Sequence, residues 1–146
     1  MNTGLLHLHN VLRWVILITL ILSIYKLYTK QDAMKTSKIL LISSHTTLLI
    51  GLYQYFTGAV GIKMIQAMGI AETMKNAATR FWAVEHIFSM ILAIIFITIG
   101  HIGYKKSQNA SRAKVLYVVA LLLIVLAMPW PFKEGVGRPW FPGMGV

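Results

Sequence analysis

Cysteine is absent from this sequence of 146 residues, and acidic residues number only four. Without cysteine, a chain cannot form disulfide bonds, thiolate metal sites, iron–sulfur clusters or c-type haem attachments. Charged residues make up only 12% of the chain, whereas they make up about 25% of ordinary soluble domains. Apolar residues make up 57%. This balance excludes an ordinary soluble domain and predicts an integral membrane protein.

Long apolar stretches are what the sequence does contain. A helix needs about 20 residues to cross the roughly 30 Å hydrocarbon core of a membrane. Four stretches reach this length, at about residues 6–28, 38–59, 81–103 and 113–130. The first follows no basic residue, so we expect a transmembrane helix there rather than a cleaved signal peptide. Short connections make consecutive helices antiparallel neighbours. The sequence therefore predicts an all-α membrane protein, with residues 1–146 forming one up-down bundle of four transmembrane helices.

The positive charges are distributed unevenly between the two ends of the expected bundle. The formal net charge is +10. Eight basic residues surround the first and third connections, whereas five lie at the opposite end, beside Glu72, Glu85 and Glu134. Connections rich in lysine and arginine face the cytoplasm. We therefore expect both termini outside the cytoplasm and the lysines near anionic lipid headgroups. This distribution does not indicate a nucleic-acid partner.

Residues 62–79, in the longest connection, have two interpretations. Met64, Ile65, Met68 and Met74 could form one apolar face of a helix that lies on the membrane surface. The alternative is an irregular polar loop that leads into the third membrane helix. The sequence leaves both open.

Five histidines lie at or inside the expected membrane helices: His7, His9, His45, His86 and His101. Ionisable groups are costly in a membrane and mark functional candidates, and histidine is the usual ligand of b-type haem. Two ligands of one haem must lie at similar depth, which the helical rise allows us to estimate. His9 lies roughly 4–5 Å and His86 about 6 Å below the outer boundary. The sequence therefore predicts His9 and His86 as the metal-ligating pair.

His45 and His101 match less well as a second pair. Measured from the cytoplasmic side, His45 lies some 10–12 Å deep, whereas His101 lies only about 3 Å from that surface. The histidines also have structural interpretations: His7 and His101 as interfacial side chains, His45 as a polar contact between helices, and His9 and His86 as residues bonded to their neighbours. Serines and threonines near His45 can bond the carbonyl four residues earlier. For the imidazole itself we expect no such local partner.

Arg13 lies one helical turn after His9, on the same face of the first helix. It lies about 10 Å inside the membrane, where a charge must reach the surface or find an acceptor. Glu85, at the mouth of the third helix beside His86, is the expected partner. These four residues predict a polar cluster under the outer surface. The cluster could bind a propionate, a quinone or a proton, or it could only anchor the helices.

Five motifs occur along nearly the whole chain: LLHLHNVLRW, SHTTLLIGLYQYF, RFWAVEH, ITIGH and PWPF…GRPWF. In these motifs the chain resembles the small bacterial four-helix membrane proteins commonly labelled cytochrome B. The resemblance implies haem b as the cofactor and electron transfer in the bacterial inner membrane. It also implies His9, His45, His86 and His101 as candidate ligands.

Two classes of function remain open. One is a small b-type cytochrome that passes electrons between quinol and a partner such as a respiratory-type membrane complex. The other is a non-redox accessory or scaffold subunit, whose polar residues only hold helices or a larger complex together. We find no Ser/His/Asp set and no paired carboxylates of the kind that hydrolytic enzymes use.

Overall fold

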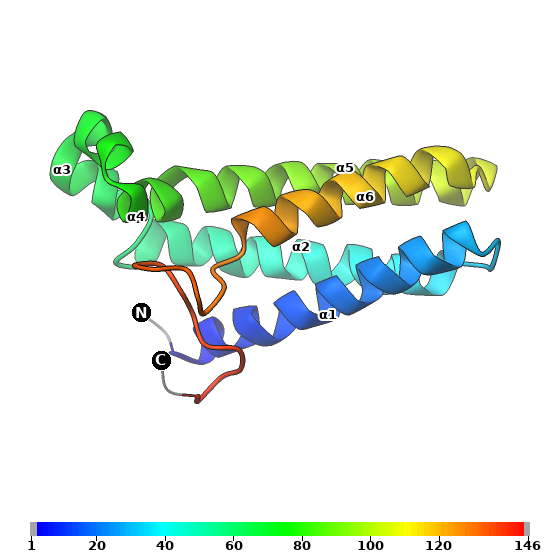
Figure 1. Ribbon diagram of the computed structural model, residues 1–146, viewed down its shortest axis with the longest axis horizontal. Helices are drawn as coiled ribbons and strands as arrows, with labels where there is room; N and C mark the ends of the chain where they lie inside the picture. Colours follow the sequence, from blue (N-terminus) through cyan, green and yellow to red (C-terminus); the bar gives the residue numbers. More distant parts are fainter. Residues whose placement is uncertain (1–2, 145–146) are drawn as a thin grey trace.

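The computed structural model describes residues 3–144, which contain helices and loops but no strands (Figure 1). Four long helices form the body of the molecule: α1 (Thr3–Tyr28), α2 (Met34–Thr57), α5 (His86–Ser107) and α6 (Ala110–Ala127). Between α2 and α5 come α3 (Ile62–Lys75), α4 (Ala77–Arg80) and the π-helical turn η1 (Phe81–Glu85). Elements α4, η1 and α5 join as one helix. Within the described residues, four helices are long and apolar enough to cross a membrane. The predicted four-helix membrane bundle is confirmed.

Local side-chain bonds and prolines set the helix boundaries. Helix α2 begins at Met34, earlier than expected, and the N–H group of Met34 donates to the Asp32 side chain at 3.0 Å. Asn76 caps α4, because its side chain accepts bonds from two N–H groups of the first turn. Helix α6 ends at Ala127, a few residues earlier than expected. Met128 is extended there because it precedes a proline.

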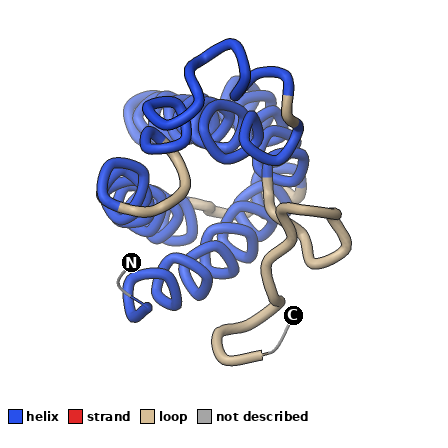
Figure 2. The backbone as a smooth tube through the Cα atoms, turned by 90° about the vertical axis from the view of Figure 1, so that its left-hand side faces the viewer, coloured by secondary structure: helices blue, strands red, loops and turns tan. Residues whose placement is uncertain are grey.

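The four long helices form a ring in the order α1, α2, α5, α6 (Figure 2). Helix α1 therefore lies diagonally opposite α5, and α2 lies opposite α6. Both ends of the described chain lie at one end of the bundle, together with α3 (Figure 1). The short turns between α1 and α2 and between α5 and α6 lie at the other end. We call these two ends the terminal end and the loop end.

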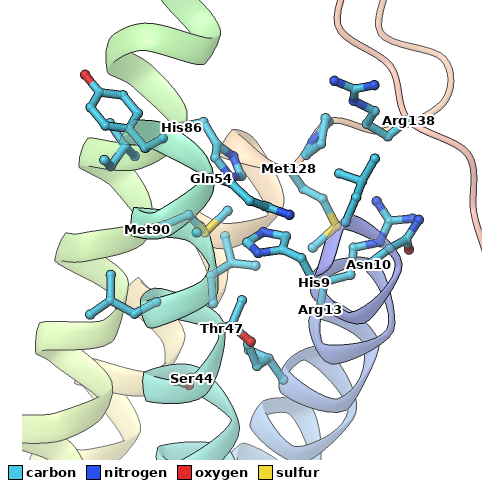
Figure 3. A pocket seen from close by; sticks show the side chains of 18 of the residues that line it. His9, Asn10, Arg13, Ser44, Thr47, Gln54, His86, Met90, Met128 and Arg138 are labelled. Carbon is cyan, nitrogen blue, oxygen red and sulfur yellow. The ribbon is translucent and has the colours of Figure 1, made fainter. Parts of the chain in front are cut away.

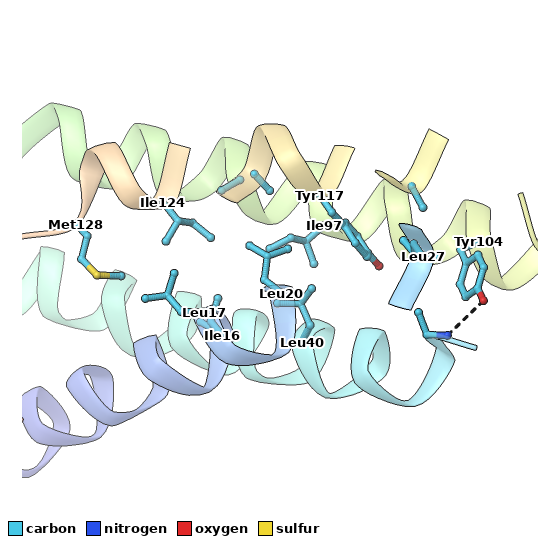
Figure 4. Close-up of a cluster of buried hydrophobic side chains, with 14 residues drawn as sticks. Ile16, Leu17, Leu20, Leu27, Leu40, Ile97, Tyr104, Tyr117, Ile124 and Met128 are labelled. Atoms are coloured by element: carbon cyan, nitrogen blue, oxygen red, sulfur yellow. Dashed lines mark hydrogen bonds between the residues drawn. The ribbon is translucent and has the colours of Figure 1, made fainter. Parts of the chain in front are cut away.

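The loop half of the bundle is filled by apolar side chains (Figure 4). Leu20, Leu40, Ile97 and Tyr117 are fully buried there. Gly100 of α5 permits the close approach of Tyr117, because a Cβ atom at position 100 would lie 2.7 Å from the tyrosine ring. Protein interiors are closely packed and leave few voids. The apolar contacts between these side chains therefore hold the four helices together in the loop half.

A polar network is buried in the same half. The Ser37 hydroxyl is hydrogen-bonded to Nδ1 of His101 at 2.7 Å and also to the hydroxyl of Tyr117. These bonds link α2 to both α5 and α6. His101 is only 6% exposed, so its side chain faces the interior of the bundle and not the surface.

The segment after α2 is helical rather than an irregular loop. Helix α3 is kinked at Gly69, whose φ of 81° is a conformation that favours glycine. Of the apolar face expected here, Met64 and Ile65 are half-buried, whereas Met68 and Met74 are exposed. The helix lies at the terminal end of the bundle, beside α4 (Figure 1).

Candidate functional site

The terminal half of the bundle contains a cavity of about 480 Å³ (Figure 3). All four long helices and the C-terminal tail contribute to its wall. Ile16, Ile97 and Ile124 line it toward the loop half, whereas His9 and Arg13 line it toward the terminal end. Ligand pockets typically measure about 300–1,000 Å³ and combine apolar walls with a few convergent polar groups. The cavity has both properties.

Two histidines lie across this cavity from each other. His9 comes from α1 and His86 begins α5, which are diagonal helices of the ring. Their ring centroids lie 6.4 Å apart, and the ring planes make an angle of 53°. Both side chains line the cavity (Figure 3). The structure thus brings together the two histidines that the helical rise placed at similar depth.

The π-helical turn positions His86. The backbone N–H group of His86 donates to the carbonyl of Phe81, five residues earlier, and such turns frequently occur at functional sites. The ring Nδ1 lies 2.8 Å from the carbonyl of Ala127, at the end of α6. A carbonyl only accepts, so Nδ1 carries the hydrogen and, in the neutral ring, Nε2 keeps its lone pair. This is the form in which an imidazole ligates a metal, and a carbonyl often orients it.

A glycine and an unpartnered nitrogen define the surroundings of His9. A Cβ atom at Gly51 of α2 would lie 3.3 Å from Cε1 of His9, so the ring lies where a larger residue would have a side chain. Nδ1 of His9 is buried and has no hydrogen-bond partner within residues 3–144. Buried polar atoms are nearly always bonded. We therefore expect its partner to be a molecule in the cavity.

Arg13 does not pair with Glu85, so this expectation is wrong. The Nη2 group of Arg13 donates to the carbonyls of Pro139 and Trp140 at 2.7 and 2.8 Å. Glu85 instead accepts a bond from Nε of Arg80 at 2.6 Å. Arg13 is 8% exposed and lines the cavity, whereas Glu85 is exposed and does not line it. The polar cluster therefore contains His9, His86 and Arg13 without the carboxylate.

Two neighbours of Arg13 hold the same C-terminal tail. Nδ2 of Asn10 donates to the carbonyl of Pro139 at 3.2 Å, and Nε1 of Trp14 donates to the carbonyl of Trp140 at 2.8 Å. The Trp14 ring also stacks on Trp140 and on Phe141, with centroid distances of 6.1 and 5.6 Å. Polar and aromatic contacts together keep the tail against α1, where it forms part of the cavity wall.

Two of the remaining histidines lie away from the cavity. His45 is exposed on α2, and its Nδ1 lies 2.9 Å from the carbonyl of Leu41 in the same helix. It therefore has a local partner, and the expected contact with another helix is wrong. His101 is bonded to Ser37 in the loop half. Neither His45 nor His101 lines the cavity, whereas the exposed His7 does.

Sequence reasoning did not identify Gly51, Gln54 or the carbonyl of Ala127 as parts of the site. Gly51 and Gln54 lie three residues apart and both line the cavity. A glycine and an amide on one face of a membrane helix are a signal that the sequence does contain. A backbone carbonyl has no such signal, because every residue carries one.

Three histidines line the cavity, of which His7 is exposed, whereas the rings of His9 and His86 face each other. Within residues 3–144, no group of three or more His, Cys, Asp or Glu residues is placed to hold a metal ion. Two imidazoles would be enough to hold a haem, because the porphyrin would supply the other ligands of the iron. Comparison with known protein families, with curated proteins and with solved structures finds no match. The geometry of the site is therefore the basis for a functional proposal.

Proposed function

We propose that this protein is a small b-type cytochrome of the bacterial inner membrane, in which His9 and His86 ligate one haem. The observation that carries the proposal is the 6.4 Å separation of the two ring centroids across the cavity. Imidazoles that bind one metal from opposite sides, with metal–nitrogen bonds of about 2 Å, have centroids about 6 Å apart. The separation therefore agrees with two imidazoles that would hold one iron between them.

The surroundings of the two rings support the same ligand. The carbonyl of Ala127 holds Nδ1–H of His86 and leaves a lone pair at Nε2. Gly51 leaves room for the ring of His9. The apolar lining toward the loop half suits a porphyrin face, and b-type haem needs no cysteine for attachment.

A bound haem supplies a one-electron redox couple at its iron. The chain holds it between α1 and α5, near the terminal end, where we expect electron exchange with quinol and with a respiratory-type membrane complex. Basic residues at the loop end, such as Lys35 and Lys105, support an orientation in which this end faces the cytoplasm. The site would then open toward the outer side of the inner membrane.

A visible spectrum tests the proposal. We expect the full-length protein, expressed with an adequate haem supply and purified in detergent, to show a low-spin b-type spectrum in the reduced-minus-oxidised difference. His9→Ala and His86→Ala should each abolish the low-spin signal, because each removes one axial ligand. His45→Ala is the matched control, since this membrane histidine does not line the cavity. It should retain the wild-type spectrum.

Two results would contradict the cytochrome. One is a colourless preparation that circular dichroism shows to be helical and folded, which would favour the accessory or scaffold subunit instead. The other is a haem spectrum that both histidine substitutions leave unchanged, which would place the haem outside this cavity.

A further inference from the structure

Buried polar atoms without a partner are concentrated at one place in the molecule. Within residues 3–144 there are four such side-chain atoms: Nδ1 of His9, Oδ1 of Asn10, Nε of Arg13 and Nε2 of Gln54. All four residues line the cavity, three from α1 and one from α2 (Figure 3). Native proteins leave few buried polar atoms unbonded. Their concentration indicates that the cavity holds polar partners, which are water or the polar end of a ligand.

The same region carries positive charge without an acidic residue. The cavity wall includes Arg13 and Arg138 but neither aspartate nor glutamate among the described residues. Two of the four acidic residues are paired with surface cations, and a third lies in the turn at the loop end. The fourth, Glu134, does not line the cavity. A charge inside a membrane is costly unless it is paired, so the site favours an anion.

Both guanidinium groups keep N–H groups for another partner. Arg13 donates through Nη2 to neutral carbonyls, while its Nε remains without a partner within residues 3–144. Arg138 lies over the ring of Trp82, with its Cζ atom 4.9 Å from the ring centroid. Stacking on an aromatic face leaves the N–H edges of a guanidinium available. These edges match a carboxylate, which can accept two parallel bonds.

We infer that the terminal end of the cavity is a carboxylate-binding subsite, in which Arg13, Gln54 and Arg138 receive the propionate groups of haem. The inference rests on the proposed function, because haem is the molecule that brings the carboxylates. Arg13 follows His9 by one helical turn, about 6 Å along the axis of α1, so one ligand can reach both residues. The unpartnered N–H groups of Arg13 and Gln54 are donors, as a carboxylate requires. Oδ1 of Asn10 is an acceptor, so it cannot bond a carboxylate and is not counted in the subsite.

A pair of ligands tests the subsite. In haem dimethyl ester both carboxylates are esterified and neutral, while the iron and the ring are unchanged. We titrate the full-length protein, prepared without haem, with haem and with the ester, and follow binding by Soret absorbance. Wild type should bind haem at least about tenfold more tightly, as expected for charge-assisted hydrogen bonds. Arg13→Gln and Arg138→Gln should reduce this ratio, because each substitution weakens the binding of haem more than the binding of the ester.

Arg80→Gln is the matched control, because Arg80 pairs with Glu85 and does not line the cavity. Its ratio should equal that of wild type. If Arg13→Gln fails to fold, Arg13→Lys takes its place and should lower the ratio in part, while Arg138→Gln gives an independent result.

Equal affinity of wild type for the two ligands would overturn the subsite and leave the haem ligation intact. A ratio that neither arginine substitution changes would overturn it as well. A phospholipid that native mass spectrometry finds on wild type and not on Arg13→Gln would assign the arginine to a lipid phosphate instead. Binding of neither ligand would overturn the proposed function itself.

Discussion

Gly51 of α2 and His9 of α1 lie in close contact, since a Cβ atom at position 51 would lie 3.3 Å from Cε1 and 3.8 Å from Nδ1 of the histidine ring. His86 lies across the cavity from the same ring, with its centroid 6.4 Å away. The position of His9 therefore depends on the glycine at position 51 of α2 as well as on its own helix.

Under the proposed function, substitution of Gly51 should displace His9 and weaken haem binding. In Gly51→Ala the new methyl group requires a shift of a few tenths of an ångström, because 3.3 Å is a tight contact. We expect up to about a tenfold loss of haem affinity, which corresponds to about 1.4 kcal/mol. Gly51→Leu should abolish the low-spin spectrum, since its side chain must occupy the space of the ring. Haem titration and visible spectra measure both effects.

Gly103→Ala is the control for the helix itself. Apart from its chain neighbours and the nearby backbone of its own helix, a Cβ atom at Gly103 would meet no described atom within 4 Å. This alanine should therefore leave the spectrum and the affinity unchanged. If Gly51→Leu also kept the wild-type spectrum, His9 would not be a ligand in the position described.

The buried hydroxyl of Ser37 should stabilise the loop half of the bundle. It bonds to both His101 and Tyr117, and Ser37 and Tyr117 are 0% exposed. Ser37→Ala leaves two buried polar groups without their partner, at an expected cost of about 1–3 kcal/mol in the free energy of unfolding. Thermal or denaturant unfolding in detergent, followed by circular dichroism, measures the loss.

Ser44→Ala is matched to this substitution. Ser44 is also 0% exposed and also lies on α2, but its hydroxyl donates to the carbonyl of Leu40 in its own helix. Its loss leaves no other side chain unpartnered, so the change should be much smaller. Equal destabilisation by both substitutions would mean that the network between helices contributes little.

The sequence predicted the fold well because hydropathy is averaged over about 20 residues of each membrane helix. Errors at single positions, such as the start of α2 at Met34, hardly affect such an average. The proximity of His9 and His86 was also predictable, because the regular rise of a helix converts residue number into depth. Depth alone does not give the direction of a side chain. His45 was therefore assigned to a contact between helices, although it is exposed on α2.

The partners of Arg13 could not be predicted for a different reason. Its acceptors are backbone carbonyls 126 and 127 residues away in the chain, which no local pattern marks. Glu85 was expected instead because carboxylates are conspicuous in a chain with only four acidic residues. The π-helical turn η1, which changes the direction of the side chains around His86, has no sequence signal comparable to proline or glycine.

The bonds from Arg13 should hold the C-terminal tail in place. Arg13→Ala removes the two charge-assisted bonds to the carbonyls of Pro139 and Trp140. Each hydrogen bond to a charged group contributes about 1.5–3 kcal/mol to the stability of the contact. We therefore expect at least about tenfold faster hydrogen–deuterium exchange at the amides of Gly137 and Arg138, which are bonded to nearby carbonyls in the docked tail. Mass spectrometry of the tail peptide measures it.

Trp14→Phe provides the comparison for the tail. It removes the donor to the carbonyl of Trp140 but keeps an aromatic ring to stack on Trp140 and Phe141. Its effect on exchange should be smaller than that of Arg13→Ala. If the two substitutions had equal effects, aromatic stacking and not the arginine would hold the tail.

The arrangement of the two ends predicts how single cysteines react across the membrane. Lys35 lies in the first turn of α2 at the loop end, Met74 lies in α3 at the terminal end, and both are exposed. The chain has no cysteine, so Lys35→Cys and Met74→Cys each carry one thiol.

The basic residues favour a cytoplasmic loop end. A membrane-impermeant maleimide added to intact spheroplasts should therefore label Met74→Cys at once, and Lys35→Cys only after permeabilisation. Labelling of both from the same side would contradict the arrangement of four membrane-crossing helices, whereas the reverse pattern would contradict only their orientation.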